Sequence, residues 1–190
     1  YDISLRLGRN LIELGATVYF LTRDDDGIRN DEYLPADHDE RHLDGEYVGK
    51  NRNTRVKKRV REINRLHRNH TGARLERVIE LHVDAHDVSK QIDIDFYYNS
   101  SAGKALAQTL RGSLEKQYKL VRPERGYRGR ITRKSSWYTL REAIPVTTYI
   151  ELGNIHHRGD QLRIIQWDNR QLIADWLALG FSDDAAQAAK

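Results

Sequence analysis

Four residues that bind protons or metal ions alternate with apolar residues in the segment 77–86: Glu80, His82, Asp84 and His86. In an extended chain, successive side chains point to opposite faces. These four groups therefore share one face, and the core face is expected to hold Ile79, Leu81, Val83 and Ala85. A row of such polar groups is costly to bury without partners. The pattern predicts a strand that has one face for packing and one for chemistry.

A second candidate, Glu151, ends the apolar segment 146–150 that follows Pro145. Ligands of α/β folds bind beyond the carboxyl ends of the strands, so both strands could deliver their polar ends to one rim. A carboxylate such as Asp84 can fix the tautomer of His82 or share a metal ion with it. These residues support a His/carboxylate hydrolase site. A structural alternative stays open, in which His82 is a satisfied core histidine and Glu151 a salt-bridged acid.

The adjacent pair His156 and His157 is a weaker candidate for metal binding, because neighbouring residues rarely point at one ion. The chain contains no phosphate-binding Gly-rich loop and no Ser or Cys nucleophile in an elbow-like motif. It has no Cys, so disulfides and thiolate metal sites are excluded, and a metal ion would need His, Asp or Glu ligands.

The expected elements alternate between helix and strand. Periodicity predicts helices at 1–14, 54–70, 101–119 and from 160 onward, and strands at 16–22, 75–83, 94–98 and 146–151. The polar segment 23–53 and the basic segment 122–136 are expected to be loops. This alternation predicts an α/β fold with a mainly parallel or mixed central sheet and helices on both faces. One domain is expected over residues 1–181, followed by a C-terminal tail at 182–190.

The composition limits the classes of partner. Charged residues make up 32% of the 190 residues, and no apolar run approaches the roughly 18–20 residues that span a bilayer. The net charge is +4, and much of the excess lies in residues 51–70, which read first as a solvated helix face. Attraction to an anionic wall polymer is one alternative. Nucleic-acid binding is disfavoured, because no aromatic residue interrupts these charges to stack on bases.

Three segments resemble the zinc-dependent N-acetylmuramoyl-L-alanine amidases of the amidase_3 type: LIELGATVYFLTRDDDGIR (11–29), VIELHVDAH (78–86) and TYIELGNI (148–155). They are similar to the family's stretches G-x-x-V-x-x-T-R-x-x-D, S-x-H-x-N and E-x-G, in the same order. Between the first two, Arg55, Arg59 and Asn64 match an Arg-containing helix that ends in Asn. The resemblance covers residues 1–181.

The resemblance implies a peptidoglycan hydrolase that cleaves the amide between N-acetylmuramic acid and the L-alanine of the stem peptide. By position, His82 matches a ligand of the family's Zn²⁺ ion and Glu151 its catalytic Glu; no substrate-binding residue is carried over. A zinc ion with three protein ligands activates a water molecule, and a nearby carboxylate can take its proton. The implied partner is peptidoglycan, with no nucleic acid and no membrane span. The periplasm or the cell exterior follows as the location from this substrate alone.

The sequence also departs from the family's pattern. Asp84 replaces the usual Asn, Glu80 replaces Ser, and His86 is extra. The family's other two zinc ligands, a His in an H-G-G turn and a Glu near the start of the first helix, have no match here. A chain that begins at Tyr1 and contains no Met is expected to be a piece of a longer protein, with both ligands upstream.

Two expectations follow from these departures. Residues 1–190 alone are expected to bind zinc weakly and to show no amidase activity. The alternative is a non-catalytic peptidoglycan-binding or regulatory domain that has the amidase fold.

The long polar segment 30–53 is expected to be a lid or a regulatory segment.

Overall fold

The centre of the protein is a mixed sheet of four strands. The structure, a computed structural model, describes residues 1–33 and 38–189. The sheet has the order β3-β6-β4-β5, formed by β3 (Arg77–Asp84), β6 (Val146–Asn154), β4 (Asp95–Tyr98) and β5 (Ile131–Arg133). The pairs β3·β6 and β4·β5 are parallel, whereas β4 and β6 are antiparallel. The predicted mainly parallel or mixed sheet is confirmed.

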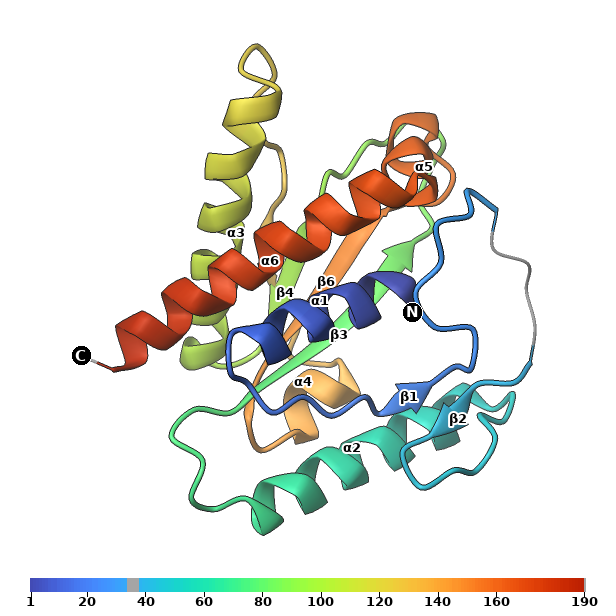
Figure 1. Ribbon diagram of the computed structural model, residues 1–190, viewed down its shortest axis with the longest axis vertical. Coiled ribbons are helices and arrows are strands. Elements are labelled where there is room, and N and C mark those ends of the chain that lie inside the picture. The colour runs from blue at the N-terminus through green and yellow to red at the C-terminus, as the bar shows by residue number, and fades with distance from the viewer. Residues whose placement is uncertain (34–37, 190) are drawn as a thin grey trace.

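Three helices cover the apolar face of this sheet: α1 (Asp2–Glu13), α3 (Ser101–Val121) and α6 (Trp167–Ala188). Their stripes of Leu, Ile and Ala meet the strand residues Phe96, Ile150 and Leu152 in a single core. In Figure 1, α6 crosses in front of the sheet with α1 beside it, and α3 lies against both α6 and the sheet. Burial of these apolar faces is the main favourable contribution to the fold.

The opposite face of the sheet is only partly covered, by α4 (Tyr138–Glu142) and α2 (Arg52–Asn69). Asn64 fastens these two helices together. Its Nδ2 donates to the carbonyl of Glu142 at 2.9 Å, and its Oδ1 accepts from the backbone N–H of Ile144 at 2.8 Å. With helices on both faces, the predicted fold class is confirmed. None of the helices in residues 1–33 and 38–189 is long and apolar enough to cross a membrane.

Three short elements differ from the predictions. Most of the predicted strand 16–22 is irregular, and only Thr22–Arg23 forms a strand, β1, which pairs with β2 (Arg41–His42) inside the predicted loop 23–53. The strand β5 lies inside the predicted loop 122–136, where Asp95 of β4 holds Arg130 through both its backbone N–H and its guanidinium. The predicted final helix is two helices, α5 (Arg158–Ile165) and α6.

Two predictions about packing were wrong. Val83, expected in the core, is 39% exposed, and Ala85 is also exposed, because β3 is an edge strand that ends at Asp84. Residues 182–188, expected to be a tail, continue α6, and Asp184 is buried against Arg77 with a 2.8 Å ion pair. Residues 34–37 of the expected lid segment and Lys190 lie outside the described residues.

Candidate functional site

The strand register brings the predicted site residues onto one face of the sheet. His82 of β3 is the register partner of Glu151 of β6, and Glu151 is in turn the partner of Asp95 of β4. Residues paired in this way point to the same face. The predicted strands therefore place His82 beside Glu151, on the face opposite the apolar core.

The carboxyl group of Glu151 is buried, with 4% of the residue exposed. Burial raises its pKa to about 7, and the negative charge of Asp84 adds to this effect, while a hydrogen bond with Tyr149 opposes it. The Oε2 atom is buried and has no hydrogen-bond partner among the described residues. Glu151 is thus a carboxyl group that can change its protonation state near neutral pH and has one oxygen free for another molecule.

Glu80, whose presence in place of Ser the sequence left unexplained, is a partner of His82. Its Oε1 lies 3.4 Å from Nε2 of His82 and 2.7 Å from the guanidinium of Arg59. Burial would raise the pKa of Glu80, but the hydrogen bond with His82 and the charge of Arg59 outweigh it and hold the pKa below the usual range. The ionised Glu80 therefore orients the imidazole of His82.

At the end of β3, Asp84 and His86 form a second carboxylate–imidazole contact, in which Nε2 of His86 makes no hydrogen bond within the described residues. Oδ2 of Asp84 lies 2.5 Å from Nε2 of His86, and Oδ1 of Asp84 accepts from the backbone N–H of Ala85 at 2.8 Å. The register between β3 and β6 shifts between His82 and Asp84, where β6 has one additional residue. The negative charge of Asp84 contributes to the raised pKa of Glu151.

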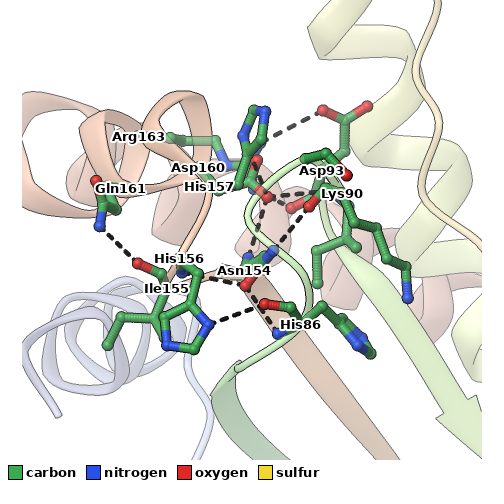
Figure 2. A network of polar contacts seen from close by, with 12 residues as sticks. His86, Lys90, Asp93, Asn154, Ile155, His156, His157, Asp160, Gln161 and Arg163 are labelled. Carbon is green, nitrogen blue, oxygen red and sulfur yellow. Dashed lines mark hydrogen bonds and ion pairs between the residues drawn. The ribbon is translucent and has the colours of Figure 1, made fainter.

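The loop that follows β3 is fixed by Asn154, the fully buried last residue of β6 (Figure 2). Its Oδ1 accepts from the backbone N–H groups of His86 and His156, at 2.9 and 3.1 Å. Its Nδ2 donates to the carbonyls of Asp87 and Lys90, each at 2.8 Å. One side chain thus satisfies four backbone groups and holds the rim of the site in place.

Next to Asn154, the buried Asp160 of α5 joins the same loop to the end of β6. Its Oδ2 accepts from the backbone N–H groups of Ile92 and Asn154, both at 3.0 Å. Gly153 lies against this helix, and a Cβ at that position would approach Cδ1 of Ile164 to 2.9 Å and Cβ of Asp160 to 3.1 Å. The Gly of the E-x-G sequence therefore allows α5 to pack closely on β6.

His156 and His157 do not converge, as Figure 2 shows. Nδ1 of His156 lies 2.8 Å from the carbonyl oxygen of His86, and Nδ1 of His157 lies 4.0 Å from Asp160. They belong to the polar network that supports the loop.

An aromatic wall, which the sequence analysis missed, borders the site and consists of His82, Tyr97, Trp137 and Tyr149. The His82 ring is stacked on Tyr149, with centroids 4.2 Å apart. Trp137 contacts both tyrosines, at 4.6 Å from Tyr149 and 4.8 Å from Tyr97. The alternation that places Glu151 on the polar face also places Tyr149 there, which is the signal that could have revealed the wall.

The described residues do not form a complete zinc site. Among residues 1–33 and 38–189, no group of three or more His, Cys, Asp or Glu side chains could hold a metal ion. His82 is a suitable single ligand, and the unpartnered oxygen of Glu151 faces the same side of the sheet. Zinc sites need at least three protein ligands, so these residues supply only part of a donor set.

The comparisons with known proteins support the fold. No protein-family model matches the chain, and no curated protein matches its sequence. Solved structures do match, and they define a class of fold, that of N-acetylmuramoyl-L-alanine amidases.

Several of these structures align with nearly all of the chain. AmiC2 of Nostoc punctiforme has a TM-score of 0.62 at 17% identity, over 97% of this chain and 83% of that one. The CwlD amidase from Clostridioides difficile, solved in complex with the GerS lipoprotein, has a TM-score of 0.65 at 15% identity, over 97% of this chain and 83% of that one. Ami1 from Mycobacterium smegmatis has a TM-score of 0.66 at 17% identity, over 96% of this chain and 73% of that one. The amidase fold implied by the resemblance is confirmed. At sequence identities of 15–17%, the structural similarity shows the fold and not the activity.

Proposed function

We propose that this domain belongs to a peptidoglycan hydrolase that cleaves the amide bond between N-acetylmuramic acid and the L-alanine of the stem peptide. The observation that carries the proposal is the pairing of His82 with Glu151 on the polar face of an amidase fold. Such a substrate would place the protein in the periplasm or outside the cell.

Glu151 is the proposed general base. It takes a proton from the water molecule that attacks the amide carbonyl carbon, and it gives this proton to the nitrogen of the leaving L-alanine as the carbon–nitrogen bond breaks. The burial of Glu151, its pKa of about 7 and its free Oε2 suit both steps. Transfer by a positioned group of this kind contributes about 10²–10⁴ in rate.

His82 is proposed as one ligand of a zinc ion. The carboxylate of Glu80 does not bind the ion itself but contacts the imidazole of His82 and orients it. The described residues do not supply the other two ligands. Residues 1–190 by themselves are therefore expected to bind zinc weakly and to release no stem peptide, and a protein that holds zinc tightly must contribute two more ligands to this face.

The experiment that tests this proposal uses the protein as its gene encodes it, purified with its metal content measured. It is incubated with purified sacculi, and the products are separated by mass. Free stem peptides that begin with L-alanine are expected, together with glycan strands that have lost them. A protein with stoichiometric zinc that releases no stem peptide would contradict the assignment.

A second candidate is a non-catalytic wall-binding domain, and the incomplete donor set favours it. It predicts that the encoded protein binds sacculi without cleaving them and that His82→Ala leaves binding unchanged. The amidase predicts that His82→Ala lowers both the zinc content and the release of stem peptide. The same pair of measurements therefore separates the two candidates.

A further inference from the structure

The aromatic wall continues from the proposed reaction centre toward β5 and α4. Tyr149 precedes Glu151 by two residues on the same strand, which corresponds to roughly 7 Å. Tyr97 is its register partner on β4, and Trp137, the residue before α4, contacts the rings of both tyrosines. The rings of Tyr149, Tyr97 and Trp137 therefore form one surface that lies one side-chain row away from Glu151.

This surface is partly open. Tyr97 is buried, with 7% exposed, but Trp137 and Tyr149 are each partly exposed. No hydrogen bond within residues 1–33 and 38–189 involves the indole Nε1 of Trp137. A partly exposed indole of this kind has both an apolar ring and a free donor to offer a ligand.

A cation lies over two rings of the wall. Nζ of Lys134 is 5.5 Å from the centroid of Trp137 and 5.7 Å from that of Tyr97. Within the described part of the chain, Lys134 forms no ion pair and its Nζ donates no hydrogen bond. The wall thus combines ring surfaces with an ammonium group that has free donors.

We propose that Trp137 and Lys134 form a saccharide subsite that holds the muramoyl ring of the substrate, with the ring stacked on the indole and Lys134 donating to its acetamido or hydroxyl oxygens. This inference rests on the proposed function and deepens it. It assigns the sugar, and not the peptide, to the side of the site that faces β5 and α4.

The chemistry of the substrate favours this orientation. A muramoyl ring is joined to the scissile carbonyl carbon by only an ether oxygen and one carbon, so the ring must lie close to the reacting atoms. Tyr149 of the wall lies roughly 7 Å from Glu151 along β6. A pyranose presents a flat face of C–H groups that matches an aromatic surface, whereas the methyl group of L-alanine is too small to cover it.

The test measures binding to the 190-residue chain, so it needs neither zinc nor turnover. The probes are a peptide-free disaccharide of N-acetylglucosamine and N-acetylmuramic acid, and a stem peptide without sugar. Saturation-transfer NMR reports which protons contact the protein, and a titration gives Kd. Trp137→Ala is expected to weaken disaccharide binding at least tenfold. Trp137→Phe and Lys134→Gln are each expected to weaken it by a smaller factor. The matched control, Trp167→Ala, removes a 45% exposed indole at the start of α6 and is expected to change nothing.

Each outcome decides one of the two proposals. Disaccharide binding that is equal in Trp137→Ala and the unaltered chain, or a wall that takes the stem peptide and not the disaccharide, would overturn this inference. Thermal melts show whether Trp137→Ala is folded, and Trp137→Phe carries the test if it is not. The proposed function fails separately, if the encoded protein binds the disaccharide through Trp137 and still releases no stem peptide from sacculi.

Discussion

Glu151 stands directly beside His82 across the parallel strands β3 and β6, as its partner in the register. The two residues are 69 positions apart in the sequence, and only the pairing of the strands brings them together. No cation forms a salt bridge with Glu151 in the described part of the chain, and Asp84 and Asp95 both act to raise its pKa. Ionising a buried carboxyl group that has no cationic partner lowers the stability of the fold, a cost that the proposed role of Glu151 in proton transfer would explain.

That cost is measurable in the metal-free chain. The pKa of Glu151 is raised to about 7 in the folded protein, so the folded state holds the proton of Glu151 more tightly than the unfolded state does. The stability that this proton contributes is fully present below the unfolded pKa and is lost as the pH rises through 7. We expect Glu151→Gln to increase the free energy of unfolding by about 3 kcal/mol above pH 8 and by little at pH 4. Urea denaturation across this pH range checks the trend. A Gln variant that is less stable than the unaltered chain at pH 8 would contradict it.

Asn154 is expected to be the most sensitive polar position of the rim. Asn154→Ala removes the partners of four buried or partly buried backbone groups, and each such loss costs about 1–3 kcal/mol if water does not replace the partner. We expect a loss of roughly 3 kcal/mol in global stability. Amide exchange in residues 85–92 should also accelerate. Asn53→Ala, at an exposed position of α2, is the matched control and should have little effect.

Asp2 predicts a second dependence on pH, of opposite sign. Burial would raise its pKa, but hydrogen bonds from Arg6 and from the backbone of Arg29 outweigh burial and lower it. Its Oδ2 lies 2.8 Å from Nε of both Arg6 and Arg170. This stabilisation is present above the unfolded pKa of about 3.9 and is lost as the pH falls through the folded value.

We therefore expect Asp2→Asn to cost about 3 kcal/mol at pH 7, because two buried guanidinium groups lose their shared partner. The difference from the unaltered chain should shrink steadily as the pH falls below 4. Asp25→Asn, at an exposed position nearby, should show no such dependence. Equal losses at pH 7 and pH 3 would rule out the ionised Asp2 as the cause.

The last turns of α6 are expected to contribute to stability. Asp184 accepts from both Nε and Nη2 of Arg77 at the start of β3, at 2.8 and 3.2 Å. Asp184→Asn should lower the free energy of unfolding by about 1–3 kcal/mol, whereas Asp183→Asn at the exposed neighbouring position should not. Equal effects of the two substitutions would show that the pairing with Arg77 adds nothing.

Local patterns in the sequence were sufficient to predict the long helices and the paired strands. Leu106, Leu110 and Leu114 recur at helical spacing, and α3 buries all three. The strand formed by residues 77–84 and the polar end at Glu151 followed from alternation alone. These features depend on neighbours within a few residues, which a sequence displays directly.

Features that depend on distant partners could not be predicted in this way. Residues 16–21 have a composition typical of a strand, yet no strand of the described residues pairs with them. The strand β5 pairs with β4, and Asp95 of β4 binds Arg130 just before β5, a contact between segments that are 35 positions apart in the sequence. The aromatic wall joins Trp137 to Tyr97 and Tyr149 from three separate segments, and so it became visible only in the structure.

If Glu151 transfers the proton in amide hydrolysis, its replacement must slow the release of stem peptides from sacculi by the zinc-loaded protein that the gene encodes. Glu151→Gln is expected to retain its zinc and its binding to sacculi but to lose about 10²–10⁴ in rate. Glu142→Gln, an exposed acid at the end of α4, is the matched control and should keep the full rate. A Glu151→Gln protein that releases stem peptides within a few-fold of the unaltered rate would contradict this account.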